Sequence, residues 1–395
     1  MYAFINATVV TVDNGIIKNG RVLVKDGRIA AIGNATLDIP KEAVQHDLTG
    51  KWLTPGLIDC HAHISNFPEP RELNAGQSDG NECSTPVTPH IRALDALNPN
   101  DPAVAKVRAA GFTTCCTLPG SGNIIGGTGI AYKLRGKTAT EMILPGTEQM
   151  KMALGENPKS AFGRRNEMPM TRMGNAAVLR KTLFDAKNYA ERKEAAAKDK
   201  EKVFETNFLL EALQKVIRGE QKVRIHSHRS DDILTACRIA EEFNLDFSIE
   251  HCTEGYKVVE ALAAIKPFCV VGPVLLGPYK QEIWGLRLEN AAELAAAGLD
   301  ICLTADTASL TYYLPMQVGL LMSYGLAEDV AFKAVTLNPA RLLGLGERLG
   351  SLTVGKDADM AVFDGHPFSN FSHCLLTVID GVFYENDGSS LLRVQ

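Results

Sequence analysis

The sequence has little of what marks membrane, secreted or nucleic-acid-binding proteins. It contains no apolar run long enough to cross a bilayer, and its first residues lack the basic stretch and apolar core of a secretory signal. The formal net charge of −5 is mild, and the Lys and Arg residues form no basic stripe that would bind nucleic acid. We therefore expect a cytoplasmic protein with neither a membrane nor a nucleic acid as its partner.

The sequence also has no Cys-x-x-Cys pair among its nine cysteines. In a chain of 395 residues this favours reduced thiols over a disulfide framework. Five cysteines lie in apolar runs, where a free thiol behaves as a small hydrophobic side chain: Cys60, Cys115, Cys116, Cys252 and Cys302. A hydrophobic share of 45% with 22% charged residues is typical of a globular protein, and the length suits a large barrel with a smaller appendage.

Both ends of the chain are rich in short strand candidates. Near the N-terminus, three of them are joined by tight turns such as Asp26-Gly. Three short strands cannot make a stable core alone, and residues 350–385 offer partners with the same pattern. We therefore predict a composite β-sandwich domain of residues 1–51 and 346–395, with residues 52–345 inserted as a second domain.

Between residues 52 and 345, apolar strand candidates alternate with stretches of helical periodicity. The eight strand candidates are Leu57–His63, Thr113–Leu118, Gly129–Leu134, Gln149–Gly155, Val223–His228, Asp246–His251, Phe268–Leu275 and Asp300–Thr304. Eight strand–helix units favour a closed parallel barrel with polar residues at the carboxyl ends of its strands. The sequence thus predicts an α/β fold, a (β/α)8 TIM-like barrel with a small β-sandwich from both termini. We expect the charged segment Arg180–Glu220 to form a surface helical excursion.

The stretch Pro55–His63, Pro-Gly-Leu-Ile-Asp-Cys-His-Ala-His, carries two histidines near the end of a strand candidate. Alternate side chains of a strand share a face, so Asp59, His61 and His63 are expected to point to the same side. Two imidazoles that share a side can chelate a metal ion. A His-x-His motif on its own more often consists of two unrelated histidines, one packed and one solvated. Only further ligand residues elsewhere in the chain can show whether this motif binds a metal ion.

Further ligand types follow other strand candidates. His226 and His228 repeat the His-x-His arrangement, and His251 ends the next strand. One barrel histidine can be a satisfied core residue, but five at the ends of three strands indicate a shared site. Asp306 follows the last strand, where it suits a metal ligand or a general base. Its alternative role is a cap for a helix that begins near Ser309.

Lys151 is predicted to point into the barrel, because the alternating residues of Gln149–Gly155 place their apolar side chains towards the helices. A buried ammonium without a partner is costly, so this lysine must be paired, neutral or chemically altered. Glu156 is the obvious structural partner.

Imidazole and carboxylate ligands suit zinc or a similar divalent ion, and the candidates are His61, His63, His226, His251 and Asp306. No thiolate follows a strand in a matching position, apart from Cys252, which should point to the opposite face. The set therefore favours an open catalytic site over a structural zinc site.

These motifs, in this order, resemble the amidohydrolase superfamily, and within it the branch of imidazolonepropionases and metal-dependent dipeptidases. The resemblance covers nearly the whole chain, through Pro55–His63, His226, Glu250-His251, Asp306 and Gly350–Val362. It implies one divalent ion bound by the first-strand histidine pair with the eighth-strand aspartate. The histidines of strands five and six then hold a second ion or orient the substrate.

The resemblance also implies roles for single residues. In one arrangement a carboxylated Lys151 would bridge two ions. The alternatives are that Glu156 is a direct ligand or that the site holds a single ion. Asp306 would accept the proton of an ion-activated water, and His251 or His228 would stabilise the oxyanion. Deaminases of the superfamily carry a glutamate where this sequence has Arg229, which disfavours deamination and makes Arg229 a candidate for binding a substrate carboxylate.

We therefore expect a hydrolase that cleaves the C–N bond of a small amide, lactam or dipeptide and uses one or two divalent ions, with zinc as the best fit. A single-metal deaminase or cyclic-amide hydrolase is the alternative. A non-catalytic assembly barrel is less expected, because all the ligands are present. Substrate identity and oligomeric state, a homo-oligomer included, stay open, since barrel specificity lies in loops such as residues 65–90 and 155–173.

Overall fold

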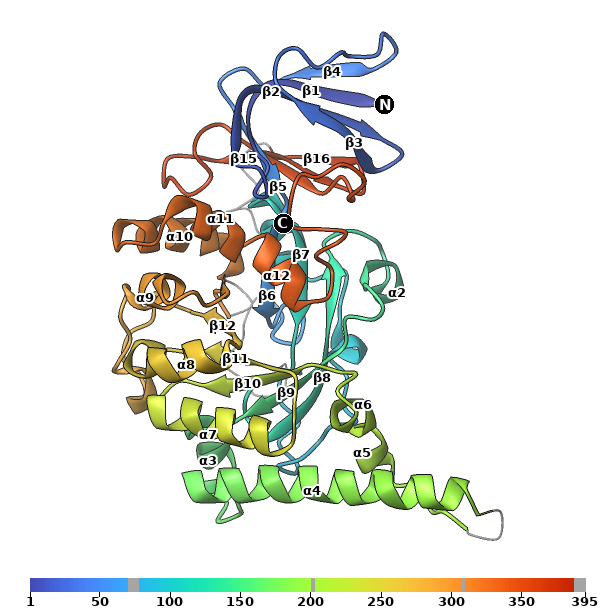
Figure 1. The fold of residues 1–395 in the computed structure, drawn as a ribbon, viewed down its shortest axis with the longest axis vertical. Coiled ribbons are helices and arrows are strands. Elements are labelled where there is room, and N and C mark those ends of the chain that lie inside the picture. The colour runs from blue at the N-terminus through green and yellow to red at the C-terminus, as the bar shows by residue number, and fades with distance from the viewer. Residues whose placement is uncertain (70–77, 200–202, 307–309, 387–395) are drawn as a thin grey trace.

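Two eight-stranded sheets organise residues 1–69, 78–199, 203–306 and 310–386, which the computed structural model describes (Figure 1). The first sheet draws on both ends of the chain. Its strands are β1 (Tyr2–Val10), β2 (Ile16–Lys25), β3 (Arg28–Gly33), β4 (Val44–Asp47), β5 (Trp52–Pro55), β14 (Met360–Phe363), β15 (Cys374–Ile379) and β16 (Val382–Glu385). Their order is β16-β15-β14-β5-β1-β2-β3, with β4 paired to β1.

Strand β5 joins the two halves of this terminal sheet. It pairs in parallel with β1 and antiparallel with β14, so strands from both ends share one hydrogen-bonded surface. Their apolar side chains form a common core that includes Phe4, Val22, Leu53 and Met360. The composite terminal sheet expected from the sequence is therefore present, and we place the start of the barrel just after β5.

Gly56 makes the turn from the terminal sheet into the barrel. A Cβ at this position would lie 2.2 Å from the side chain of Thr113, so only glycine allows the two chains to approach this closely. The backbone N–H of Gly56 donates to the carbonyl of Asp359 (2.9 Å), and that of Leu57 donates to Gly111 (2.9 Å). Strand β5 of one sheet thus continues directly into the first strand of the other.

The second sheet is the barrel wall, and each of its strands overlaps one of the eight apolar runs predicted from the sequence. They are β6 (Leu57–Ala62), β7 (Phe112–Thr117), β8 (Ile125–Lys133), β9 (Gln149–Ala153), β10 (Val223–Ser227), β11 (Phe247–His251), β12 (Phe268–Val271) and β13 (Ile301–Leu303), in this spatial order. The first and last strands approach one another, where the hydroxyl of Thr304 donates to the carbonyl of His61 (2.6 Å). The sheet is thereby nearly closed into a barrel.

The expectation that all eight strands are parallel is wrong for β8, which runs antiparallel to both β7 and β9. Residues 118–124, which connect β7 to β8, contain no helix. A parallel crossover needs a dozen or more residues, so this short connection returns the chain in the opposite direction. The remaining neighbouring strands of the barrel pair in parallel.

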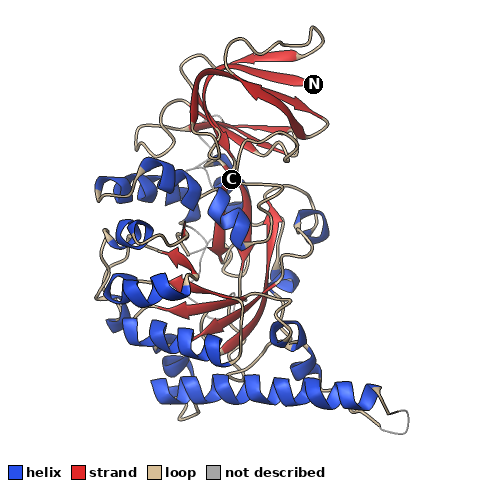
Figure 2. Ribbon diagram, in the orientation of Figure 1, coloured by secondary structure: helices blue, strands red, loops and turns tan. Residues whose placement is uncertain are grey.

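Helices lie around the barrel strands (Figure 2). Their apolar side chains pack with those of the strands in one buried core. The helices are α1 (Pro102–Ala109), α2 (Ala139–Met142), α3 (Glu156–Gly163), α4 (Arg172–Ala197), α5 (Phe208–Glu211), α6 (Gln214–Ile217), α7 (Ser230–Glu242), α8 (Val259–Ile265), α9 (Asn290–Ala296), α10 (Leu314–Ser323), α11 (Glu328–Ala334) and α12 (Leu337–Leu342). Short 3-10 turns occupy Ala93–Ala96, Gly255–Val258, Gln281–Ile283 and Thr311–Tyr313. None of the helices in the described ranges is long and apolar enough to cross a membrane.

Helix α4 is the expected surface excursion. It begins at Arg172, eight residues before the start of the charged segment Arg180–Glu220 in which it was predicted. It runs along the end of the molecule opposite the terminal sheet and extends beyond the barrel (Figure 1). Leu179, Leu183 and Tyr189 are buried on its inner side, whereas the charged residues are mostly exposed. Residues 200–202 of the predicted excursion lie outside the described part of the chain.

A buried ion-pair network fastens the barrel to the terminal sheet. The ammonium of Lys133, at the end of β8, lies 3.0 Å from carboxylate oxygens of both Asp357 and Asp359 and also donates to Asp380. Arg135 adds a second bond to Asp380 (2.6 Å). Lys133 is fully buried, so these three aspartates supply the charge that its burial requires.

Candidate functional site

Strand β6 places His61 and His63 inside the barrel at its carboxyl end, and both are buried. Their Nε2 atoms lie 3.4 and 3.2 Å from one carboxylate oxygen of Asp306, so these three residues converge as the spacing predicted. Asp59 does not join them. It accepts hydrogen bonds from the backbone of His61 (3.1 Å) and from Thr311 (3.0 Å), because the pairing register shifts between Asp59 and Ala62 and breaks the simple alternation.

A buried carboxylate fixes the orientation of the His61 ring. Glu250 on β11 accepts the Nδ1 proton of His61, and Arg224 on β10 donates to both oxygens of Glu250 at 2.6 and 2.8 Å. All three side chains are inaccessible to solvent. Nε2 of His61 therefore faces the barrel interior with its lone pair, next to the Lys151 ammonium at 3.0 Å.

Other hydrogen bonds leave an inward-facing nitrogen on three further rings. Nδ1 of His63 bonds the carbonyl of Leu118 (2.7 Å), Nδ1 of His251 bonds that of Gly272 (2.8 Å), and Nδ1 of His228 bonds the hydroxyl of Thr253 (2.7 Å). In each case Nε2 is left for another partner. His226 is buried, yet neither of its ring nitrogens has a hydrogen-bond partner among the residues that the structure describes.

Backbone conformations with positive φ bring two of the side chains to the site. His251 has φ 70° and the following Cys252 has φ 46°, while Asp306 has φ 61°. Such angles are costly for residues other than glycine and concentrate at functional positions. Ser248 and Glu250 share the inner face of β11, so regular alternation would turn His251 outwards; the left-handed turn brings it back to the barrel mouth.

Two groups of side chains in the described residues have the geometry of metal ligands. In the first, nitrogen or oxygen atoms of His61, His251 and Asp306 all lie within 4.8 Å of one another. In the second, the same holds for His226, His228 and His251. Because His251 belongs to both groups, they form one continuous cluster at the carboxyl ends of the strands.

Burial keeps the imidazoles of this cluster neutral. It lowers the pKa of His61, His226 and His228 well below 6.5 and that of His251 to about 4. Burial alone would raise the pKa of Asp306, but the neighbouring histidines hold it well below 3.8. The cluster therefore presents neutral nitrogens and one carboxylate at neutral pH, the protonation states in which these groups bind a metal ion.

Lys151 is buried on β9, and its ammonium faces the same space. Burial lowers the pKa of Lys151 to about 8, against the opposing charges of Glu250 and Asp306. Glu156 is not its partner. The carboxylate of Glu156 accepts the backbone N–H of Glu282 (3.3 Å), because Gly155, with φ 83°, turns the chain into α3.

Arg229 lies apart from the cluster. Its guanidinium donates to the carboxylate of Asp231 in two bonds of 2.9 Å, on the first turn of α7. His228, the other residue expected to bind substrate, lines the cavity above the cluster. Residues 307–309, where a helix capped by Asp306 was the alternative, lie outside the described residues, as do residues 70–77 of one predicted specificity loop.

A cavity of about 480 Å³ opens over the cluster and makes it accessible to a small molecule. Its polar lining includes His63, His226, His228, Asp306, Asn157 and Lys280. Lys280 and Glu282, which bond one another at 2.6 Å beside His228, were missed from the sequence. They follow an irregular segment after β12, in which no periodicity signals an inward side chain.

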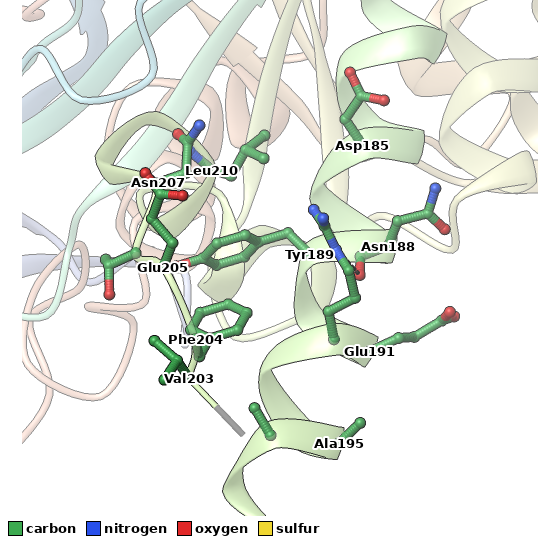
Figure 3. Close-up of a pocket in the computed structure, with 13 residues that line it drawn as sticks. Asp185, Asn188, Tyr189, Glu191, Ala195, Val203, Phe204, Glu205, Asn207 and Leu210 are labelled. Carbon is green, nitrogen blue, oxygen red and sulfur yellow. Dashed lines mark hydrogen bonds between the residues drawn. The ribbon is translucent and has the colours of Figure 1, made fainter. Parts of the chain in front are cut away.

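A larger cavity, of about 1020 Å³, lies between α4 and residues 203–210 (Figure 3). Tyr189 points from α4 into this space and donates to Glu211 (2.7 Å), with Phe204 against its ring. None of the metal-ligand groups found in the described residues lies here. The chemistry therefore belongs to the smaller cavity at the strand ends.

The fold and this cluster define a class of protein, the barrel enzymes whose catalytic groups follow the strands and can hold a divalent ion. The chain belongs to the amidohydrolase family: the family profile described as "Amidohydrolase family" matches residues 52–387. It is therefore an enzyme, a metal-dependent hydrolase that acts on carbon–nitrogen bonds, and it is related to the imidazolonepropionases.

Relatives of known sequence or structure cover most of the chain. An amidohydrolase from Thermotoga maritima MSB8 is 42% identical, covers 98% of this chain and 100% of its own, and superposes with a TM-score of 0.93. The imidazolonepropionase of Maricaulis maris (strain MCS10) is 28% identical, over 91% of this chain and 90% of that protein. Amidohydrolase tasK of Hapsidospora irregularis is 29% identical over 93% of this chain, which spans 40% of that longer protein.

Proposed function

We propose that the cavity at the strand ends hydrolyses the C–N bond of a small amide, lactam or dipeptide, with water activated at a divalent ion and with Asp306 as the general base. The observation that carries this proposal is the convergence of His61, His63, His226, His251 and Asp306 beneath an open cavity. Neutral imidazoles and a carboxylate suit zinc.

The side chains fit such an ion on two counts. Within the described part of the chain, His226 has two buried ring nitrogens without a hydrogen-bond partner, which is rare unless a further ligand is present. The rings of His61 and His251 each have Nδ1 engaged by a carboxylate or a carbonyl, which leaves Nε2 to bind. When bound, the ion would lower the pKa of a water and polarise the scissile carbonyl.

The residues of the chain then supply the proton transfers. Asp306 lines the cavity with its carboxylate deprotonated, so it can accept the proton of the attacking water and deliver it to the leaving nitrogen. The neutral ring of His251 donates its Nδ1 proton to Gly272, so its Nε2 carries a lone pair and cannot donate to an oxyanion. We therefore assign His251 to ion binding in place of the oxyanion role expected from the sequence.

The alternative role of a single-metal deaminase is less well supported. The position that would carry an acidic residue is occupied by Arg229, whose guanidinium pairs with Asp231 outside the cavity lining. Lys151 offers a way to separate the two functions, because its pKa of about 8 leaves part of the amine neutral and available for carboxylation. An intact mass measured without acid would show the added carboxylate of a bridged two-ion site.

The test is hydrolysis of dipeptides, N-acyl amino acids and lactams by protein reconstituted with Zn²⁺. We expect turnover of one class, loss of turnover after chelation, and a loss of about 10²–10⁴ in kcat for Asp306→Asn, the range of a general base. Asp364→Asn is the matched control, because Asp364 is an exposed carboxylate near His373 in the terminal sheet. Undiminished hydrolysis by metal-free protein would contradict the proposal.

A further inference from the structure

We infer that Asp59 is a positioning residue, which holds Asp306 in place at the seam where the first and last strands of the barrel meet. The inference rests on the proposed function, because Asp306 is the general base of that reaction. It goes beyond the proposed function by giving a role to a buried carboxylate that the reaction does not use. Asp59 is not among the residues that line the cavity, so it acts through Asp306 and not on the substrate.

The seam between β6 and β13 lacks a backbone ladder. In the described part of the chain, ladders join the barrel strands in the order β13-β12-β11-β10-β9-β8-β7-β6, and none joins β13 back to β6. His61 and His63 lie on one side of this seam and Asp306 lies on the other. The position of Asp306 relative to the two histidines therefore depends on side chains that cross the seam.

Hydrogen bonds of buried side chains cross the seam on both sides of Asp306. The hydroxyl of Thr311 donates to one carboxylate oxygen of Asp59 (3.0 Å), whose other oxygen accepts the backbone N–H of His61 (3.1 Å). The hydroxyl of Thr304 donates to the carbonyl of His61 (2.6 Å) and accepts the backbone N–H of Asp306 (2.9 Å). Because Thr304 precedes Asp306 and Thr311 follows it, the segment that carries the general base is fastened to β6 at both ends.

Asp306 needs this support because its backbone has φ 61°. Such a conformation costs free energy in a residue other than glycine and persists only where the surrounding structure holds it. The backbone N–H of Ala305 also bonds the carboxylate of Asp59, so the hold reaches the residue next to Asp306. One carboxylate oxygen of Asp306 then lies 3.2 Å from Nε2 of His63 and 3.4 Å from Nε2 of His61.

The burial of Asp59 indicates that its position is specific. Asp59, Thr304 and Thr311 are all buried. No lysine or arginine of the described ranges forms an ion pair with Asp59, so hydrogen-bond donors alone stabilise its charge. A buried carboxylate without a cation is costly. The donors that offset this cost belong to the two segments that carry the site, β6 and the chain after β13.

The test compares variants of the full chain that differ in one hydroxyl group. Thr311→Val keeps the size of the side chain but removes the donor to Asp59, whereas Thr311→Ser keeps the donor. In crystal structures of the metal-free proteins, we expect the carboxylate of Asp306 to move about 1 Å away from His63 in Thr311→Val, a displacement large enough to matter for catalysis. In Thr311→Ser it should keep its 3.2 Å separation from Nε2 of His63.

Two measurements in solution follow from the same displacement. The dissociation constant of Zn²⁺, from competition with a chelating dye, should rise about 10–100-fold in Thr311→Val, the range for losing a group that orients a ligand. With a substrate identified by the hydrolysis screen, kcat should fall about 100-fold, because a misplacement of about 1 Å can have that effect. KM should change little, since neither Asp59 nor Thr311 lines the cavity, and Thr311→Ser should restore both quantities.

Asp59→Asn separates hydrogen bonding from charge. Its amide keeps an oxygen for the backbone N–H of His61, and its amide nitrogen can donate to the hydroxyl of Thr311. Asp306 should therefore keep its place in this variant.

Thr377→Val is the matched control. Thr377 is a buried threonine of β15, and its hydroxyl bonds the carbonyl of Arg108 (2.7 Å), away from the cavity. Its loss should lower stability and leave Zn²⁺ binding unchanged. If Thr311→Val does not fold, Thr304→Val removes the other hydroxyl that crosses the seam and should displace Asp306 in the same way.

Two results would overturn the inference. One is a Thr311→Val protein with Asp306 in place and an unchanged dissociation constant for Zn²⁺, which would reduce Asp59 to a contribution to stability. The other is a displaced Asp306 in Asp59→Asn, which would assign the effect to charge. A wild type that hydrolyses none of the substrates would refute the proposed function, and the crystal structures would still decide the position of Asp306. Equal hydrolysis by the wild type and Thr311→Val would refute the positioning role alone.

Discussion

At the scale of single residues, the spacing of the sequence predicted the candidate metal ligands but not the side chains that contact them. His61, His63 and His226 could be found because alternation at a strand end sets the side on which a side chain lies, whereas His251 reaches the site through a left-handed backbone conformation that the letters do not show. Lys280 and Glu282, which lie beside His228, could not be found, since an irregular segment has no periodicity that predicts where its side chains point. Asp59 was misplaced for a related reason: a register shift in β6, invisible in the letters, broke the alternation on which the prediction rested.

The buried histidines predict an acid-sensitive metal-free protein. The pKa of His251 is lowered to about 4 in the folded chain, whereas an unfolded histidine has a pKa of about 6.5. Between these values the unfolded chain binds more protons, so stability present above pH 6.5 is lost as the pH falls towards 4. Each fully shifted histidine contributes up to about 1.4 kcal/mol per pH unit. Urea unfolding with a chelator present, at pH 7, 6 and 5, measures this loss.

His228→Gln is the comparison for that experiment, because burial also lowers the pKa of His228 well below 6.5. The variant should lose less stability between pH 7 and pH 5 than the wild type. Equal slopes in the two proteins would mean that His228 is protonated in the folded chain.

At the scale of helices and strands, the apolar runs predicted the existence of all eight barrel strands and the pairing of the chain ends. They did not predict the direction of β8, because the composition of an apolar run is the same for a parallel and an antiparallel strand. The strand direction follows from residues 118–124, which are too few to form the helical crossover that a parallel strand needs. The Lys133 network was also missed, since its partners are separated from it by more than two hundred positions in sequence.

We predict that Lys133→Met destabilises the protein by about 3–5 kcal/mol, the cost of leaving buried carboxylates without their cation. Asp357, Asp359 and Asp380 would then repel one another beneath the terminal sheet. The loss should be smaller at pH 5 than at pH 8. Burial already raises the pKa of Asp359 to about 6, opposed by Lys133, so acidification neutralises this group first. Urea midpoints at the two pH values give the measurement.

Lys181→Met provides the control, because Lys181 is exposed and its ion pair among the described residues is with Asp185, one turn along α4. Its effect should stay below about 1 kcal/mol at either pH, as is usual for surface pairs. A Lys133 variant no less stable than this control would show that the network contributes nothing to the junction.

At the scale of the whole molecule, the candidate metal ligands come from distant parts of the barrel wall. His61 belongs to β6, His226 to β10 and His251 to β11, while Asp306 follows β13, so a bound ion would connect strands from opposite parts of the barrel wall. The sequence predicted the division into barrel and terminal sheet, because short strand candidates without helices are replaced by alternating strand and helix patterns between residues 52 and 345. The shapes of the connecting loops could not be predicted, since no periodicity governs them.

Reconstitution with Zn²⁺ should therefore raise the stability of the whole chain. At a free ion concentration about 1,000-fold above the dissociation constant, one ion adds about 4 kcal/mol to the free energy of unfolding. Calorimetric melting with Zn²⁺ and with a chelator measures the gain, and Asp306→Asn should reduce it. Identical melting curves in the two conditions would place the ion outside the folded core.

The pairing of β5 with β14 has a consequence for how the protein is made. Roughly 300 residues separate Pro55 from Met360, and a ribosome adds about 5–20 residues per second. The opening strands therefore wait about 15–60 s before their partner leaves the exit tunnel. During that interval the edge of β5 that later pairs with β14 lacks its partner, so we expect the nascent chain to need protection from aggregation until residues 360–363 have been made.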